Sequence, residues 1–167
     1  MDALGLLRIR VRRGMNLAVR DTRSSDPYVV IESGSQRVKT RVIKDNCNPV
    51  WDEELTIYVK DLNDSIVLSV YDKDTFTGDD SMGNARIDIK PYIECLRMGL
   101  KDLPDGTRID RVAPSSENCL ADESFVVWNK GKMTQDMILR LRNVECGEVD
   151  VQIEWLDLPG CSRGFKI

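Results

Sequence analysis

Alternation of apolar and charged residues with a period of two is the feature that most constrains the fold of this chain. In LLRIRVRRGMNL, Leu7, Ile9 and Val11 occupy every second position, and arginines fill the positions between them. Because successive side chains of a strand point to opposite faces, this segment predicts a strand with one buried and one basic face. The same pattern returns near the end of the sequence in EVDVQIEW, which predicts a second strand of this kind.

Other short segments with strand character lie between turn-forming residues. They are PYVVIES and QRVKTRV, joined by an SGS turn, then ELTIYV, IVLSVYD and MGNARIDI, and then QDMILRLRN, which ECGE joins to the last strand. Regularly spaced short strands with turn signals between them are typical of a β-sandwich. The sequence therefore predicts an all-β, eight-stranded antiparallel sandwich.

The strand pattern is interrupted between residues 91 and 134. PYIECLRMGL starts with proline and carries apolar residues at helical spacing, which predicts a short helix. The polar stretch after it has turn signals in PDG and NKG, and a short hairpin is one interpretation of it. We expect a single domain over 1–167, in which 91–134 is a short α/β insertion before the last two strands.

The cysteine and histidine content argues against several kinds of site. There are five widely spaced cysteines without a CxxC pair, and there is no histidine. Reduced thiols of a cytosolic or nuclear protein are therefore favoured over a disulfide framework, and a zinc site is disfavoured. The commonest general base is missing, as are a phosphate-binding glycine loop and a nucleophile elbow, so we expect no enzymatic activity.

The stretch VYDKDTFTGDDSMG places four aspartates within nine residues. Asp72 and Asp74 follow a predicted strand, and two more aspartates return after a short loop. A distant turn-rich segment, VRDTRSSDP, carries another pair that can join them if the two loops meet at one end of the sandwich. Ca²⁺ prefers roughly six to eight oxygen ligands from carboxylates and carbonyls. The pattern therefore favours a cation site built from two loops.

Three alternatives for this acidic cluster fit less well. An EF-hand loop starting at Asp72 would need glycine at Thr77 and glutamate at Gly83, and its flanks are strands rather than helices. A two-metal hydrolase would need a general base or a leaving-group clamp, for which the sequence offers no candidate. Solvated turns rich in aspartate explain an isolated D-x-D better than they explain acids on two separate loops.

Three motifs carry a resemblance to a known family. SDPYVV, NPVWDEEL and VYDKDTFTGDDSMG, in this order, resemble the signature blocks of C2 domains. The resemblance implies two or more Ca²⁺ ions held by the carboxylates of Asp21, Asp26, Asp72, Asp74 and Asp80. Secondary ligand candidates are Thr77 and the backbone carbonyls of Arg20 and Lys73, and Asp79 is then a neighbour of the site. With the first strand at the N-terminus, the resemblance implies the type II, phospholipase-like topology.

A closer resemblance extends from end to end. GLLRIRVRRGMNLAVRD, ENCLADES, QDMILRLRNVECGEV and EWLDLPG are similar to the plant C2-domain abscisic-acid-related family, which also carries an insertion between its last strands. It implies a Ca²⁺-dependent adaptor that brings abscisic acid receptors of the PYR/PYL/RCAR class transiently to the plasma membrane and promotes abscisic acid signalling. The alternative is a regulator that binds an unconventional YchF-type G protein and stimulates its GTPase activity.

The expected environment follows from the same resemblance. The protein is predicted to work in the cytoplasm and at the periphery of the plasma membrane, with the nucleus as a further location. Anionic phospholipid is the expected surface, and no nucleic-acid partner is expected. No apolar run approaches the ~20 residues that span a bilayer, and the N-terminus lacks the core of a signal peptide.

Several residues are candidates for lipid contact. Phe76, at the tip of the acidic loop, is predicted to insert into the membrane once a cation cancels the acids, with packing onto the sandwich as the alternative. Arg23, in the first loop, is a headgroup contact or a solvated charge. Arg37, Lys39 and Arg41 alternate along QRVKTRV and so would share one face, which binds phosphoinositides in related domains or is simply solvated.

Aromatic residues divide into core and partner candidates. Trp51 and Trp155 are predicted to lie in the core. Trp128 and Phe125 belong to the apolar run FVVW in the insertion, and we expect this run to form a surface for a protein partner.

Overall fold

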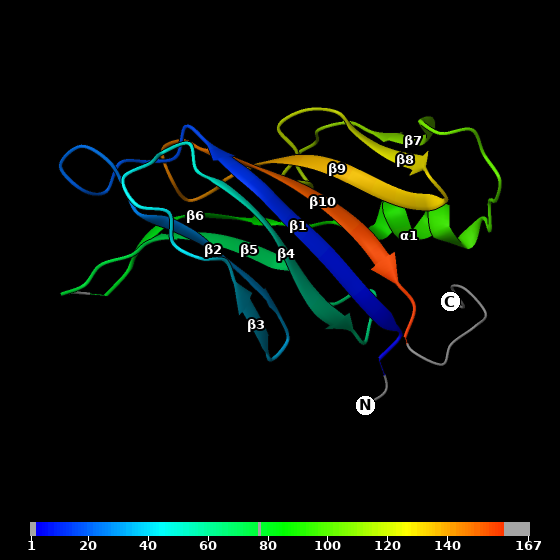
Figure 1. The fold of residues 1–167 in the computed structure, drawn as a ribbon, viewed down its shortest axis with the longest axis horizontal. Coiled ribbons are helices and arrows are strands. Elements are labelled where there is room, and N and C mark those ends of the chain that lie inside the picture. The colour runs from blue at the N-terminus through cyan, green and yellow to red at the C-terminus, as the bar shows by residue number, and fades with distance from the viewer. Residues whose placement is uncertain (1–2, 77, 159–167) are drawn as a thin grey trace.

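The computed structural model describes residues 3–76 and 78–158. In chain order the elements are β1 (Gly5–Met15), β2 (Pro27–Ser33), β3 (Gln36–Lys39), β4 (Val50–Val59), β5 (Val67–Asp72), β6 (Asp80–Arg86), α1 (Lys90–Arg97), β7 (Thr107–Val112), β8 (Ser124–Asn129), β9 (Lys132–Arg140) and β10 (Glu148–Leu156). They form a six-stranded sheet in the order β4-β1-β10-β9-β8-β7 and a four-stranded sheet in the order β3-β2-β5-β6 (Figure 1).

The all-β sandwich is confirmed, but the predicted count of eight strands is wrong, since the described residues form ten. The two additional strands, β7 and β8, lie in the segment predicted as an insertion and continue the six-stranded sheet beyond β9. They are short and are flanked by polar loops, so their alternation is weak in the sequence. The helix ends at Arg97, earlier than the apolar spacing suggests, and Gly99 then takes a positive φ of 62°.

The first strand lies in the middle of its sheet. β1 pairs antiparallel with β4 on one side and with β10 on the other, so that Leu7 is level with Ile57 and with Trp155. A first strand between the fourth and the last strand is the arrangement expected for the type II topology. The strands that begin and end the described fold therefore lie side by side.

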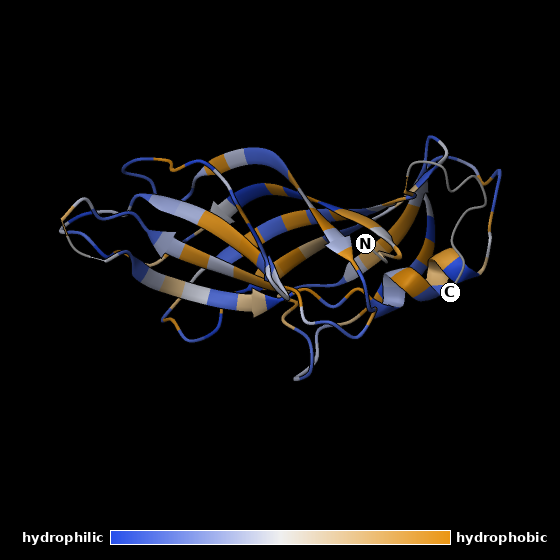
Figure 2. Ribbon diagram, turned by 90° about the horizontal axis from the view of Figure 1, so that it is seen from below, coloured by the Kyte–Doolittle hydropathy of each residue, from blue (hydrophilic) through white to orange (hydrophobic). Residues whose placement is uncertain are grey.

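The alternation along the strands produces the core. The odd-numbered apolar residues of β1 and β10 are fully or almost fully buried, and the residues between them face outward. Figure 2 shows this as bands of hydrophobic and hydrophilic residues along the strands. Trp51 and Trp155 are buried, as predicted.

The arginines of β1 do not form a free basic face. Arg8 lies 3.4 Å from Glu54 and 3.1 Å from Glu154, on the two flanking strands. Arg12 pairs in the same way with Asp136 at 3.0 Å and Asp150 at 3.5 Å. Each exposed pair stabilises the fold by less than about 1 kcal/mol. Together they neutralise most of the positive charge that the sequence places on this strand.

The predicted insertion shares the core of the sandwich. Helix α1 buries Tyr92, whose hydroxyl donates to the Met133 carbonyl at 2.6 Å and accepts from the Trp155 backbone N–H at 2.9 Å. The helix is thereby fastened to β9 and β10, and burial raises the pKa of Tyr92. β9 already starts at Lys132, so the C-terminal boundary of the predicted insertion lies slightly too far along the chain.

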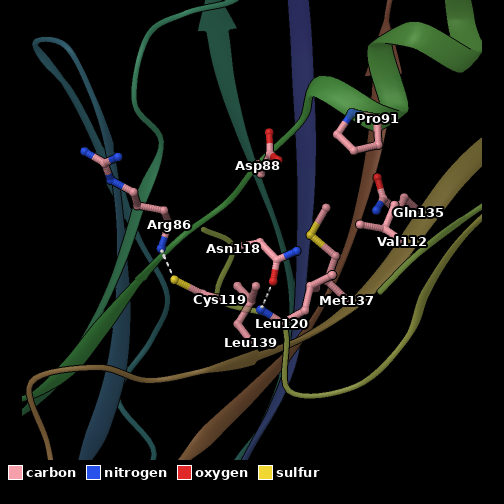
Figure 3. A pocket seen from close by; sticks show the side chains of 10 residues that line it. All are labelled: Arg86, Asp88, Pro91, Val112, Asn118, Cys119, Leu120, Gln135, Met137 and Leu139. Atoms are coloured by element: carbon pink, nitrogen blue, oxygen red, sulfur yellow. Dashed lines mark hydrogen bonds between the residues drawn. The ribbon is translucent and has the colours of Figure 1, made fainter. Parts of the chain in front are cut away.

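A small cavity remains where the insertion meets the sandwich (Figure 3). The Arg86 backbone N–H bonds to the Cys119 sulfur at 3.3 Å, which brings the loop after β7 over the edge of β6. The cavity of about 10 Å³ has room for one water molecule. Gln135 lines it, and the Oε1 of Gln135 has no hydrogen-bond partner among the described residues.

Candidate metal centre

The acidic loops meet at one end of the sandwich. The first loop, residues 16–26, joins β1 to β2, and the loop of residues 73–76 and 78–79 lies between β5 and β6. Because β2 and β5 pair with Pro27 level with Asp72, both loops leave the four-stranded sheet at neighbouring positions. Figure 1 shows them together at the end of the molecule away from α1. The meeting of the loops, a condition for the predicted site, is therefore fulfilled.

Three of the predicted ligands form a compact group. Oxygen atoms of Asp21, Asp26 and Asp72 all lie within 4.8 Å of one another. The Asp26 backbone N–H donates to Asp72 Oδ1 at 2.7 Å, and the Lys73 N–H donates to the Asp26 carbonyl at 3.0 Å. The Asp45 N–H holds Asp26 Oδ1 at 2.8 Å. Backbone donors therefore position the carboxylates before any ion binds.

The separation of these oxygens fits a calcium ion. Ca–O distances of roughly 2.3–2.6 Å place ligands on opposite sides of one ion about 5 Å apart. A group of oxygens that spans no more than 4.8 Å can therefore surround a single ion. Hard carboxylate oxygen is also the donor type that Ca²⁺ prefers.

Asp72 is the most buried acid of the group, with 2% of its surface exposed. Burial raises its pKa, the hydrogen bond from Asp26 partly offsets this, and the charges of Asp21, Asp26 and Asp80 raise it further. The charged form of Asp72 is thus disfavoured in the metal-free fold. A bound cation would remove this penalty, since an opposite charge favours the ionised carboxylate.

Asp80 and Asp74 lie beside this group rather than within it. Asp80 is level with Asp72 in the pairing of β5 with β6. Asp74 uses Oδ1 to accept the Phe76 N–H at 2.9 Å, and its own N–H donates to Asp79 Oδ1 at 2.9 Å. Their role as ligands stays a prediction.

Asp79 braces the loop, consistent with its expected place as a neighbour of the site. One of its oxygens accepts from Asp74, and the other accepts from the Tyr28 hydroxyl. These two hydrogen bonds are the main causes of the lowered pKa of Asp79. Burial and this contact raise the pKa of Tyr28 to about 12, and its ring stacks on Tyr71 at 5.8 Å.

The loop end also presents apolar side chains. Phe76 is 94% exposed, so it does not fold back onto the sandwich. Val19 and Val50, which were not among the predicted residues, are 50% and 61% exposed at the same end. Neither valine carries a signal in the sequence, because an apolar residue beside a strand is typical of the core. Arg23 is exposed as well, and Thr77 lies outside the described residues.

The predicted row of basic residues is shorter than expected. β3 ends at Lys39, so Arg37 and Lys39 share an exposed face but Arg41 lies beyond the strand. The Arg41 guanidinium pairs with Glu53 at 3.3 Å, and its N–H donates to the same carboxylate at 2.9 Å. The alternation of three basic residues on one strand is therefore wrong, because an acid on β4 binds the third.

The predicted partner surface is divided between two faces. Phe125 and Trp128 are three residues apart on β8, which pairs with β9 without a bulge, so they point to opposite sides of the sheet. Trp128 packs against the core. Phe125 lies on the other face, where the Arg108 guanidinium carbon is 4.0 Å from its ring centre. These two residues do not form one surface.

Arg20 was predicted only as a carbonyl ligand, yet its side chain makes a prominent contact. The guanidinium binds both oxygens of Glu145, at 2.9 and 2.8 Å. The pair lowers the pKa of Glu145 to about 2. The sequence offered no signal for this contact, because 125 residues separate the partners.

Sequence comparison places these features among known proteins. The C2 domain family matches residues 5–103. Protein C2-DOMAIN ABA-RELATED 10 of Arabidopsis thaliana is 60% identical over 97% of this chain and 91% of its own length. GTPase activating protein 1 of Oryza sativa subsp. indica is 52% identical over 96% of both chains.

Structural comparison agrees on the fold. The two calcium-bound C2 domains of extended synaptotagmin 2 match with a TM-score of 0.63 and 24% identity, over 93% of this chain and 47% of theirs. Human GIVD cytosolic phospholipase A2 matches with a TM-score of 0.60 and 20% identity, over 95% of this chain and 17% of that enzyme. No helix among the described residues combines the length and the apolar character needed to cross a bilayer.

Proposed function

This chain belongs to the C2-domain ABA-related family, and we propose that it is a Ca²⁺-dependent adaptor that binds anionic phospholipid and carries abscisic acid receptors of the PYR/PYL/RCAR class to the plasma membrane. In this proposal it promotes abscisic acid signalling from the cytoplasm and the membrane periphery, has no catalytic step, and binds no nucleic acid. The observation that carries the proposal is the group of Asp21, Asp26 and Asp72 oxygens within 4.8 Å at the loop end.

The proposed switch is electrostatic. Metal-free, the aspartates of the two loops repel an anionic surface. Bound Ca²⁺ would supply positive charge and open coordination positions for lipid phosphate oxygens. Two ions would cancel the formal net charge of −4. Because backbone N–H groups already position Asp26 and Asp72, the change needs no refolding of the loops.

Side chains around the loops would complete the membrane contact. Phe76 projects into solvent from the tip and would add apolar burial. Arg37 and Lys39 supply an exposed basic pair on β3, and each would contribute about 1 kcal/mol near an anionic surface. Arg23 is a further headgroup contact in this proposal.

A sedimentation assay tests the switch. The wild-type protein should pellet with phosphatidylserine vesicles in Ca²⁺ and stay in the supernatant in chelator. Phosphatidylcholine vesicles are the control for charge. A separate pull-down on these vesicles should recover a receptor of the PYR/PYL/RCAR class only when Ca²⁺ is present. Equal pelleting in chelator would contradict the switch.

A second candidate function has its own support. GTPase activating protein 1 of rice is similar to this chain over 96% of both lengths, and its name states an effect on a GTPase. We therefore propose, as the alternative, stimulation of a YchF-type G protein. Purified protein should raise the GTP hydrolysis rate of such a G protein in single-turnover assays without lipid. An unchanged rate at saturating concentration would remove this candidate and leave the adaptor.

A further inference from the structure

Arg20 brings a positive charge next to the proposed cation site. It directly precedes Asp21, and its guanidinium Nε donates to the Ser81 carbonyl at 3.2 Å, one residue after Asp80. An arginine so close to carboxylates is a competitor for them, since its fork of donors suits a carboxylate well. In this structure the guanidinium is instead committed to Glu145 through two hydrogen bonds of 2.8 and 2.9 Å.

Glu145 sits on a loop that is fastened to the same strand as Asp80. Between β9 and β10, the backbone of Arg142 exchanges two hydrogen bonds with Asn84 of β6, at 2.7 and 3.0 Å. The side chain of Val144 fills the space beside Gly83, where a Cβ would come within 2.5 Å of it. The position of Glu145 is therefore set relative to β6, and the Arg20 side chain is held at a defined place.

The first loop is braced from the other side by its own residues. The Arg20 backbone N–H donates to Ser25 Oγ at 2.8 Å, and that hydroxyl donates to the Ala18 carbonyl at 2.8 Å. The loop backbone is thus fixed without Glu145. Loss of Glu145 would release the guanidinium rather than unfold the loop.

We propose that Glu145 is a positioning residue for the calcium site, which binds the Arg20 guanidinium and so keeps this internal cation from occupying the aspartates that hold Ca²⁺. The inference rests on the proposed function, because it presupposes that the loop end binds Ca²⁺. It assigns a task to a residue outside the predicted ligand set and explains why a cation is tolerated beside the site.

A double-mutant cycle on Ca²⁺ affinity, measured by calorimetry without lipid, tests the inference. Glu145→Gln should weaken Ca²⁺ binding about tenfold or more when Arg20 is present, the scale of outer-shell losses at metal sites. In an Arg20→Gln background the same change should weaken it less than about threefold, because no guanidinium is left to release. The melting temperature of each variant in chelator reports on the fold.

A matched control separates positioning from a general charge effect. Glu148→Gln removes a carboxylate from the same end of the six-stranded sheet, where Glu148 pairs with Arg140 at 3.5 Å instead of with Arg20. It should leave Ca²⁺ affinity within about twofold of wild type. Equal losses for Glu145→Gln in both Arg20 backgrounds, or no loss in either, would overturn the inference. Absence of Ca²⁺ binding by the wild-type protein would instead refute the proposed function.

Discussion

Replacing Asp72 with asparagine should abolish Ca²⁺-dependent binding to phosphatidylserine vesicles and raise the melting temperature of the metal-free protein. Asp72 is the buried member of the oxygen group, so its loss removes a ligand from the centre of the site. We expect Ca²⁺ affinity to fall by at least about a hundredfold, the upper end of losses for outer-shell partners. Asparagine keeps an oxygen for the Asp26 N–H, so the loop geometry survives.

The opposite effects on binding and stability make this prediction sharp. Burial raises the folded-state pKa of Asp72, so its negative charge lowers stability at neutral pH, and protonation relieves this as pH falls. In chelator, the excess stability of the asparagine variant should therefore shrink as pH is lowered from neutral to acidic. Calorimetric melting across pH measures this difference.

A distant aspartate is the control for Asp72. Asp64→Asn changes an exposed acid in the loop between β4 and β5, at the other end of the sandwich. It should alter neither Ca²⁺ affinity nor vesicle binding. Retained vesicle pelleting in Ca²⁺ by the Asp72→Asn variant would contradict the proposed metal centre.

Replacing Phe76 with alanine should weaken vesicle binding in Ca²⁺ by roughly ten- to a hundredfold. Burial of a phenylalanine side chain is worth about 1.5–3 kcal/mol, and nearly all of this side chain is exposed in the free protein. Ca²⁺ affinity without lipid should stay unchanged, because the ring contributes nothing to the carboxylate group. Vesicle titration and calorimetry without lipid measure the two quantities separately.

An exposed apolar residue far from the loops supplies the comparison for Phe76. Met98→Ala removes a 60% exposed side chain directly after α1, and vesicle binding should not change. Equal vesicle affinity of Phe76→Ala and wild type would show that charge alone holds the protein on the lipid surface.

The sandwich could be predicted because its information is local. In β1 and β10 every second residue is apolar, and burial follows that alternation directly. The meeting of the two acidic loops could be proposed only as a condition, since spacing along the chain does not show where strands pair. The full set of five ligands came from family resemblance rather than from spacing.

The remaining features depend on contacts between distant segments. The apolar run of β8 predicts a single patch when it is considered alone, although a strand sends Phe125 and Trp128 to opposite faces. The prediction for Arg41 failed because Glu53, from another strand, draws it away. The contact of Arg20 with Glu145 joins residues that no local pattern connects.

The central position of β1 has a practical consequence. Its start and the end of β10 are adjacent, with Leu6 level with Leu156, at the end of the molecule away from the acidic loops (Figure 1). A fluorophore or surface tether attached near either strand end would leave the loop end unobstructed. A chip coupled through such a tether would present the loops outward, ready for vesicles flowing over it.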